Sequence, residues 1–512
     1  MSDPTQRGDA PVLDREMCYR ALRARDPRFD GRLFVGVRTT GIYCRPVCPA
    51  RTPKLENIVF YPSAAAAQQA GFRPCLRCRP ETSPELATWR GTANTVTRGL
   101  ALIAEGSLDD GDVAGLADRL GVGERQLRRL FKEHLGASPI AVAQTKRVLF
   151  AKQLVHQTQM TMGDIALAAG FGSVRRFNDT FHRLYGRPPS ALRRSRREAP
   201  DPAAIELELR YEPPYDWDAM FDFLRARAIP GVENVADGVY RRSARIDGHT
   251  GLVEVRPLRE RPAVAVTIRF PRVVALPAIV LRVRRLFDLG ADTSTIAGQL
   301  AEDRDLAPLV RARPGLRVPG AWDGFELALR AILGQQISVV RARQLAGDLV
   351  ALCGERLPEA LADVDPGVTF AFPSPERVAE SALGRLGMPG ARIRTLAGVA
   401  ASVAADPSLL QSGSDLETSV ARLCSLPGIG EWTAQYVAMR ALREPDAFPA
   451  ADLGLLRAAE RWNVCAPTAA ALRARAEAWR PWRAYAAQHL WTSAGSSEAA
   501  VALPERGQEH AA

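Results

Sequence analysis

Four of the eight cysteines in this 512-residue chain stand close together near its N-terminus. They occur in the stretches GIYCRPVC and PCLRC, as Cys44, Cys48, Cys75 and Cys78. A C-x3-C pair followed, after 26 residues, by a C-x2-C pair is typical of four thiolates that hold a tetrahedral Zn²⁺. Two interpretations stay open: the zinc is purely structural, or it also stores one thiol as the reactive thiolate.

A second candidate group is Asp452, in DAFPAADLGLL, where it precedes an apolar helical run. By itself such an aspartate is most simply a helix N-cap. Upstream, LPGIG at 426–430 separates two helical segments and is typical of a helix-hairpin-helix turn. Gly428 and Gly430 would let backbone N–H groups approach a DNA phosphate, although five residues alone could also be an ordinary link between helices.

Length and composition limit the kind of protein that carries these groups. A chain of this length is expected to form three or four units. A net charge of +11 and a pI near 9.6 favour an anionic partner, above all nucleic acid. The N-terminus lacks the apolar region of a signal peptide, and the most apolar stretch, at 273–287, is interrupted by arginines and a proline. We therefore expect a soluble cytoplasmic protein with reduced thiols, which favours metal binding or catalysis over disulfides.

An internal repeat predicts how DNA would be bound. LADRLGVGERQLRRLFKEHLG (116–136) matches IALAAGFGSVRRFNDTFHRLYG (165–186), with Gly121 aligned to Gly170. Each copy has a short helix, a glycine turn and a second helix, which is typical of a helix-turn-helix unit. A six-helix structural bundle is the alternative. On the outer faces of the second helices, the candidate DNA contacts are Arg125, Gln126, Arg128, Arg129, Arg175 and Arg176.

The rest of the chain shows a change of periodicity. Residues 193–204 are charged and contain proline, as linkers do. From 205 to about 270 the apolar residues alternate, as in IELELRY and AVAVTIRF, which predicts strands. Beyond about 275, amphipathic helical segments continue towards the C-terminus.

The cysteine stretches and the repeat together resemble the N-terminal half of the Ada family of adaptive-response regulators. RDPRFDGRLFVGVRTTGIYCRPVCPAR and ENIVFYPSAAAAQQAGFRPCLRCRPE carry this resemblance, which covers most of residues 15–192. It implies that Cys44 accepts a methyl group from a methyl phosphotriester in DNA. Alkylation would take the four-thiolate zinc site from a formal charge of about −2 to about −1, weaken its repulsion of phosphate and tighten promoter binding. The Pro-Cys-His-Arg motif of the second Ada methyltransferase is absent, so repair of O6-methylguanine is not expected.

Residues from about 205 to 495 resemble helix-hairpin-helix DNA glycosylases, and among them the AlkA type that releases 3-methyladenine. The matching stretches are YDWDAMFDFLRARAIPGVENV, RLFDLGAD, RPGLRVPGAWDGFELALRAILGQQIS, LPGIGEWTA and WRPWRAYAAQHLW. The resemblance implies that Asp452 stabilises an oxocarbenium-like sugar and presents a water. Trp432, Tyr436 and Trp491 would line the pocket for a flipped cationic base.

Further details follow from the same resemblance. Trp432 stands where strand-cleaving relatives carry a lysine, so we expect a monofunctional enzyme that leaves an intact abasic strand. Gln336, in GQQIS, occupies the position of the intercalating wedge, which is a leucine in the AlkA type. The hairpin at 426–430 is a candidate for a monovalent cation. No four-cysteine run follows the glycosylase core, so an iron–sulfur cluster is not expected.

The expected fold class is multidomain and mainly α, with α+β parts. Five segments are expected: a small zinc-bound α/β methyl-acceptor domain (1–90), a tandem helix-turn-helix bundle (91–193), a small antiparallel β-sheet domain (205–285), a helix-hairpin-helix glycosylase domain (286–495) and a disordered tail (496–512).

The predicted function is a response to alkylation damage: methyl transfer to Cys44 activates transcription, while the C-terminal half acts as a DNA-3-methyladenine glycosylase. The alternative is a transcriptional regulator whose glycosylase-like half only binds DNA. A zinc-stabilised architectural protein would leave Asp452 and the aromatic residues unexplained. The expected partners are double-stranded DNA and, during activation, RNA polymerase, with no membrane. The expected location is the bacterial cytoplasm, in association with the nucleoid.

Overall fold

The computed structural model describes most of the chain, and the expected tail at 496–512 lies outside the described residues, as does most of the expected linker at 193–204. None of the described helices has the length and hydropathy that crossing a bilayer requires. The described residues are 14–83, 95–109, 111–193, 201, 203–411 and 414–495.

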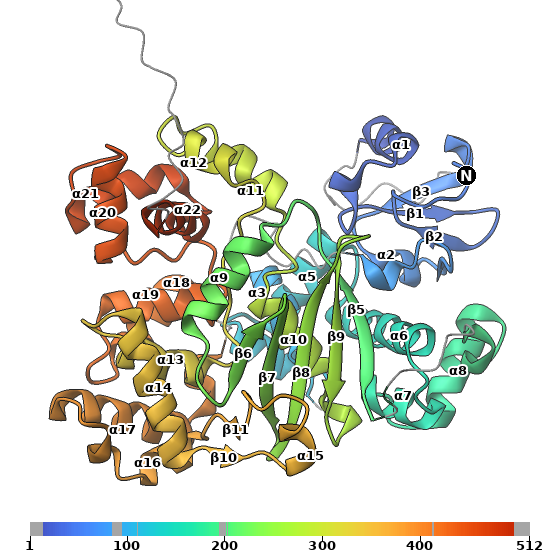
Figure 1. Ribbon diagram of the computed structural model, residues 1–512. Coiled ribbons are helices and arrows are strands. Elements are labelled where there is room, and N and C mark those ends of the chain that lie inside the picture. The colour runs from blue at the N-terminus through green and yellow to red at the C-terminus, as the bar shows by residue number, and fades with distance from the viewer. Residues whose placement is uncertain are drawn as a thin grey trace, which may run out of the picture.

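A small four-stranded sheet forms the N-terminal module, with the strand order β3-β1-β2-β4 (Figure 1). Strand β1 pairs antiparallel with β2 and β3, and Val35 lies opposite Cys44 in the register. Its described apolar side chains form small clusters around Val35 and Tyr43, and Ile42 and Ala50 pack against the buried cysteines. The elements are α1 (Arg15–Ala24), β1 (Phe34–Val37), β2 (Ile42–Cys44), β3 (Ile58–Tyr61), α2 (Ala64–Gln69) and β4 (Arg73–Pro74).

Six helices follow and confirm the two helix-turn-helix units. Gly121 and Gly170 end the first helices of the two units with φ values of +67° and +72°, a conformation that glycine adopts without steric cost. The second helices bury Phe131 and Phe181, each fully enclosed. The elements are α3 (Thr95–Ala104), α4 (Val113–Arg119), α5 (Glu124–Leu135), α6 (Pro139–Gln157), α7 (Met162–Ala168) and α8 (Val174–Tyr185).

A five-stranded antiparallel sheet lies at the centre of the molecule, with the order β5-β9-β8-β7-β6 (Figure 1). It confirms the strands expected in IELELRY and AVAVTIRF, because those stretches form β5 and β9. Helices α9 and α10 share its apolar core. The elements are β5 (Ile205–Arg210), α9 (Trp217–Arg227), β6 (Glu233–Ala236), β7 (Val239–Ile246), β8 (His249–Leu258), β9 (Ala263–Arg269) and α10 (Leu276–Leu286).

The helix-turn-helix module and this sheet are packed together. Strand β5 is an edge strand, and α6 covers it: Gln153 Nε2 donates to the Glu208 carbonyl at 3.0 Å, and the Glu208 N–H donates to Gln157 Oε1 at 2.8 Å. Phe181 of α8 and Val266 of β9 belong to one continuous buried core. That core therefore runs across the boundary expected between 193 and 205.

The C-terminal module is helical, as expected, with one large core. Two strands of two residues each, β10 and β11, are an addition that the sequence pattern does not predict. The elements are α11 (Thr293–Leu300), α12 (Ala307–Ala312), α13 (Gly324–Leu333), α14 (Val339–Cys353), β10 (Glu355–Arg356), α15 (Glu359–Ala362), β11 (Phe370–Ala371), α16 (Pro375–Glu380), α17 (Gly390–Ala405), α18 (Leu416–Cys424), α19 (Glu431–Arg440), α20 (Leu453–Arg461), α21 (Ala469–Ala476) and α22 (Arg483–Gly495).

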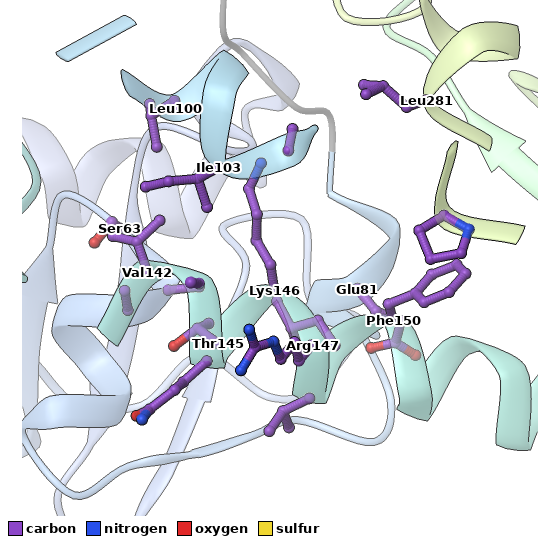
Figure 2. A pocket seen from close by; sticks show the side chains of 18 of the residues that line it. Ser63, Glu81, Leu100, Ile103, Val142, Thr145, Lys146, Arg147, Phe150 and Leu281 are labelled. Carbon is purple, nitrogen blue, oxygen red and sulfur yellow. The ribbon is translucent and has the colours of Figure 1, made fainter. Parts of the chain in front are cut away.

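A cavity of about 1330 Å³ lies where the modules meet. Figure 2 shows Lys146 and Phe150 of α6, Leu100 of α3 and Leu281 of α10 among its lining residues. Neither the cysteine cluster nor Asp452 lines it. This cavity is therefore separate from both groups of candidate reactive residues.

Candidate functional site

The four N-terminal cysteines form one cluster, as their spacing predicts. Cys44 ends β2, and all four Sγ atoms lie within 4.8 Å of one another. Four sulfurs at about 2.3 Å from a tetrahedral zinc would be about 3.8 Å apart, so the cluster fits this ion. Hydrogen bonds with Cys48, Cys75 and Cys78, together with burial, raise the pKa of the Cys44 thiol. A cation is therefore needed to hold all four groups as thiolates.

Two buried cations lie beside the cluster, and each is paired with a carboxylate. The Arg45 guanidinium pairs with Asp30 and donates to the Cys78 carbonyl at 3.1 Å. Lys152 of α6 donates to the Cys75 carbonyl at 3.0 Å and to Glu81 at 2.5 Å. Glu81 also pairs with Arg79 at 3.3 Å, so the cations beside the cluster exceed their carboxylate partners by one and offset only part of the formal charge of a four-thiolate site.

Cys44 differs from the other three cysteines in ways that favour reactivity. It is half-buried, whereas Cys48, Cys75 and Cys78 are buried. Backbone N–H groups donate to the sulfurs of Cys75 and Cys78, each at 3.3 Å. Within the described ranges, no N–H donor to the Cys44 sulfur is found. An accessible sulfur that accepts no backbone N–H is expected to be a better nucleophile than sulfurs that do, once a metal holds it as thiolate.

Asp452 is a helix N-cap, and its carboxylate also accepts hydrogen bonds from two tryptophan side chains. Its Oδ1 accepts the Leu455 N–H at 3.0 Å, which caps α20. The same carboxylate accepts two indole N–H groups, from Trp491 at 2.7 Å and from Trp432 at 2.9 Å. The two interpretations of Asp452 are thus compatible: the cap and the indoles orient a half-buried carboxylate at the aromatic residues.

The three aromatic residues expected in the base pocket lie together. Trp432 and Tyr436 are stacked, with ring centroids 5.5 Å apart and planes 11° from parallel. Trp491 of α22 meets Tyr436 edge-on at 6.5 Å. The spacing of Trp432 and Tyr436, four residues apart on α19, puts both on one face of the helix. Aromatic faces held in this way can bind a flat cationic base.

Two further residues of this cluster are not identified from the sequence. Phe223 of α9 and Arg440 at the end of α19 lie against each other, with the Arg440 Cζ 4.4 Å from the Phe223 ring centroid. Arg440 follows Tyr436 by four residues, a spacing that signals a shared helix face. Phe223 has no such signal, because its contact joins two segments far apart in the chain.

The hairpin confirms a helix-hairpin-helix arrangement. Gly428 has φ +84°, and a Cβ there would lie 1.9 Å from Thr395 Oγ1. The conformation and packing of the turn therefore require glycine, whether or not DNA binds. Gly430 is different: a Cβ there would meet no atom within 4 Å. It begins α19 without a side-chain cap, which leaves the first N–H groups of the helix available to a phosphate.

The wedge position lies in a loop tied to this hairpin. Gln336 is exposed between α13 and α14 and has φ +57°. The neighbouring Gln335 donates to the Gly428 carbonyl at 3.3 Å and to Thr433 Oγ1 at 3.1 Å. Val340 in the same region is 66% exposed. The loop and hairpin therefore lie together, near Trp432 at the start of α19.

The candidate DNA contacts of the helix-turn-helix units are exposed on α5 and α8. Arg128 forms an ion pair with Glu124 one turn earlier. On α8, the Arg175 side chain is 92% exposed, whereas Arg176 lines the cavity between the modules. Arg175 also forms a long ion pair with Asp179, at 3.9 Å, and its high exposure leaves it able to reach DNA.

The different surroundings of Gly428 and Gly430 give a first testable prediction. Gly428→Ala should destabilise the protein by about 2 kcal/mol, since it combines positive φ with a steric clash. Gly430→Ser should preserve the unfolding temperature because serine is a good N-cap. It should nevertheless weaken duplex DNA binding about tenfold, by occupying the phosphate position. Thermal unfolding and fluorescence anisotropy would measure both effects. Unchanged DNA affinity in Gly430→Ser would remove the phosphate role.

A second prediction concerns metal removal. Because the described apolar clusters of the N-terminal module are small and one of them is centred on the cysteines, chelation should unfold β1–β4. Hydrogen exchange should then become fast there and stay slow in β7 and β8, which serve as the internal control. Retained protection of β1–β4 after complete metal loss would contradict this expectation.

Comparison with known protein families gives four matches along the chain. The metal binding domain of Ada matches residues 17–81, and a helix-turn-helix domain matches 116–195. The AlkA N-terminal domain matches 206–323. The HhH-GPD superfamily of base excision DNA repair proteins matches 329–484. The four cysteines lie inside the first match, and this protein holds one Zn²⁺ there.

Curated relatives cover both halves. DNA-3-methyladenine glycosylase 2 of Escherichia coli is 36% identical over 290 residues, which are 56% of this chain and 97% of that protein. The bifunctional transcriptional activator/DNA repair enzyme Ada of the same organism is 35% identical over 162 residues, which are 32% of this chain and 44% of that protein.

One relative spans nearly the whole molecule. The "Probable bifunctional transcriptional activator/DNA repair enzyme AlkA" of Mycobacterium tuberculosis is 42% identical over 485 residues, 94% of this chain and 96% of that protein. The order of the four matched domains agrees with the modules of the fold. This protein therefore belongs to the family of bifunctional transcriptional activators and DNA repair enzymes that join an Ada-type N-terminal half to an AlkA-type glycosylase.

Proposed function

We propose that this protein responds to alkylation of DNA with two activities. Its N-terminal half takes a methyl group from a DNA methyl phosphotriester and then activates transcription. Its C-terminal half releases alkylated purines such as 3-methyladenine by hydrolysis of the N-glycosidic bond. The observation that carries the second activity is the Asp452 carboxylate, held by two indoles at an aromatic pocket.

For methyl transfer, Cys44 is the proposed acceptor. Bound zinc would keep its sulfur as thiolate near neutral pH. The Cys44 sulfur attacks the methyl carbon, a C–S bond forms, and the C–O bond breaks with its electrons staying on the phosphate. The site loses one negative charge and the DNA gains one. Weaker repulsion between the two should then tighten promoter binding, with recruitment of RNA polymerase as the proposed consequence.

For base release, Asp452 is the proposed catalytic residue. The alkylated purine is already cationic, so its bond to C1′ breaks without a strong general acid. Asp452 stabilises the positive sugar and accepts a proton from the water that adds to C1′. Trp432 stands at the position of the lysine in strand-cleaving relatives, so no amine is available there for a Schiff base. The product is an intact abasic strand.

One preparation can test both activities. Duplex DNA methylated on phosphate and on purines should add one methyl group to the protein, seen by mass spectrometry, and should release free bases. Methyl uptake without base release would favour the alternative, a regulator whose glycosylase-like half only binds DNA. The domain limits, a monovalent cation at the hairpin (426–430) and association with the nucleoid also remain proposals. The outcome of this experiment does not depend on them.

A further inference from the structure

Arg440 lies against the aromatic residues of the expected base pocket. It is the last residue of α19 and follows Trp432 and Tyr436 at spacings of eight and four residues. Its Cζ is 5.0 Å from the Tyr436 ring centroid and 5.4 Å from that of Trp491. The side chain is 3% exposed and contacts aromatic rings of α9, α19 and α22. Figure 1 shows where these three helices lie. A buried positive charge thus touches the rings that would hold the base.

Among the described residues, no carboxylate pairs with this charge. Arg440 Nη1 donates to the Pro319 carbonyl at 2.8 Å, and Nη2 donates to Gln488 Oε1 at 3.3 Å. Across the described part of the chain, no ion pair of Arg440 is found, whereas the equally buried Arg242 pairs with Glu326. Burial lowers the pKa of Arg440 to about 10, so the group remains charged at neutral pH. Its field is therefore not cancelled at close range.

A cation in this position opposes the binding that the pocket is expected to provide. A guanidinium over one side of an aromatic ring reduces the attraction of that ring for a second cation. A cationic purine would therefore be held less tightly than the three rings alone would hold it. Asp452 accepts the indole N–H of Trp432, which precedes Arg440 by about two turns on α19, and that of Trp491. Charges of opposite sign thus contact the same group of rings.

The reaction moves charge in the direction that this arrangement favours. When the C1′–N bond breaks, both bonding electrons go to the purine, which becomes neutral, and the positive charge passes to the sugar. Water then adds to C1′, and its proton goes to Asp452. The charge moves away from Arg440 and towards Asp452. An interaction that raises the energy of the bound substrate more than that of the transition state raises kcat.

We propose that Arg440 is a specificity-determining residue that destabilises a cationic base in the pocket and so favours transfer of its charge towards Asp452. This inference rests on the proposed base release. It predicts that a cationic substrate will bind more tightly when the charge of Arg440 is removed, while a neutral base of the same shape will not.

Two duplexes that differ only in the charge of the base test this proposal. One carries 7-methylguanine on a 2′-fluorinated sugar, which resists hydrolysis. The other carries neutral 7-methyl-7-deazaguanine on the same sugar. Arg440→Gln keeps an N–H donor for Pro319 and removes the charge. It should bind the cationic duplex about tenfold more tightly and leave the neutral duplex within about twofold, which corresponds to one charge pair at moderate dielectric.

Arg440→Lys is the matched control, because it keeps the charge and should keep the wild-type ratio of the two affinities. Methyl uptake at Cys44 and thermal unfolding would verify that each variant is folded. Affinities of Arg440→Gln that change alike for both duplexes, or that do not change for the cationic duplex, would overturn the proposal. A wild-type protein that binds the duplexes selectively but releases no base from unfluorinated DNA would instead contradict the proposed function.

Discussion

Replacing Asp452 with asparagine should reduce base release by a hundredfold or more while DNA binding persists. The substitution removes the negative charge beside the sugar, and electrostatic contributions of about 3 kcal/mol or more are typical of such groups. A carboxylate that only capped α20 would give a different result, since asparagine is also a good N-cap and the change would cost at most about 1 kcal/mol. Single-turnover release of 3-methyladenine from duplex DNA measures the difference.

The hydrogen bonds of Asp452 make a sharper control possible. An asparagine oxygen can still accept from Leu455 and Trp491, but its NH₂ group would face the indole N–H of Trp432, and two donors cannot pair. Some loss of activity could then come from a displaced ring. Trp432→Phe removes that donor, so Asp452→Asn should be compared with wild type again in the Trp432→Phe background. Recovery of base release in the double variant would contradict a catalytic charge.

Cys44→Ser should abolish methyl uptake and leave base release at the wild-type rate. A serine hydroxyl is a far weaker nucleophile than a thiolate at neutral pH, so no slower transfer to this position is expected. Asp452 belongs to a different module, and its contacts do not involve the cluster. Peptide mapping by mass spectrometry after exposure to methyl-phosphotriester DNA measures the uptake.

The matched control is Cys353→Ser, which removes a buried thiol outside the cluster and should keep full uptake. Zinc content should be measured in both variants, because loss of a ligand also weakens metal binding. A methyl group found on Cys48, Cys75 or Cys78 in the wild type would show that the acceptor is assigned wrongly.

Much of the architecture can be predicted from sequence because local rules determine it. The cysteine spacing predicts one cluster, and the repeat predicts two helix-turn-helix units because each turn depends on a nearby glycine. The alternation in IELELRY and AVAVTIRF predicts strands for the same reason. The aromatic residues of the pocket were predicted through a resemblance, and they lie together in the fold.

Contacts between distant segments could not be predicted in this way. Phe223 reaches Arg440 only because α9 packs beside α19, and hydrophobic periodicity does not specify which helices become neighbours. The same holds for the core shared by α8 and β9. The hydrogen bonds from Trp432 and Trp491 to Asp452 could not be predicted either. The sequence indicates that a helix begins at Asp452, but not which indole N–H groups lie beside its carboxylate.

The cover that α6 places over β5 has a consequence for any attempt to produce the glycosylase half alone. Gln153 and Gln157 fill the outward hydrogen-bonding positions of Glu208, and apolar residues of α7 and α8 lie over the same core. Cutting the chain between 193 and 204 would leave an open strand edge and an uncovered apolar face, which together promote pairing between copies. The helix-turn-helix module is thus part of the cover of the glycosylase sheet rather than a separate unit on a tether, and a usable fragment would need a redesigned β5.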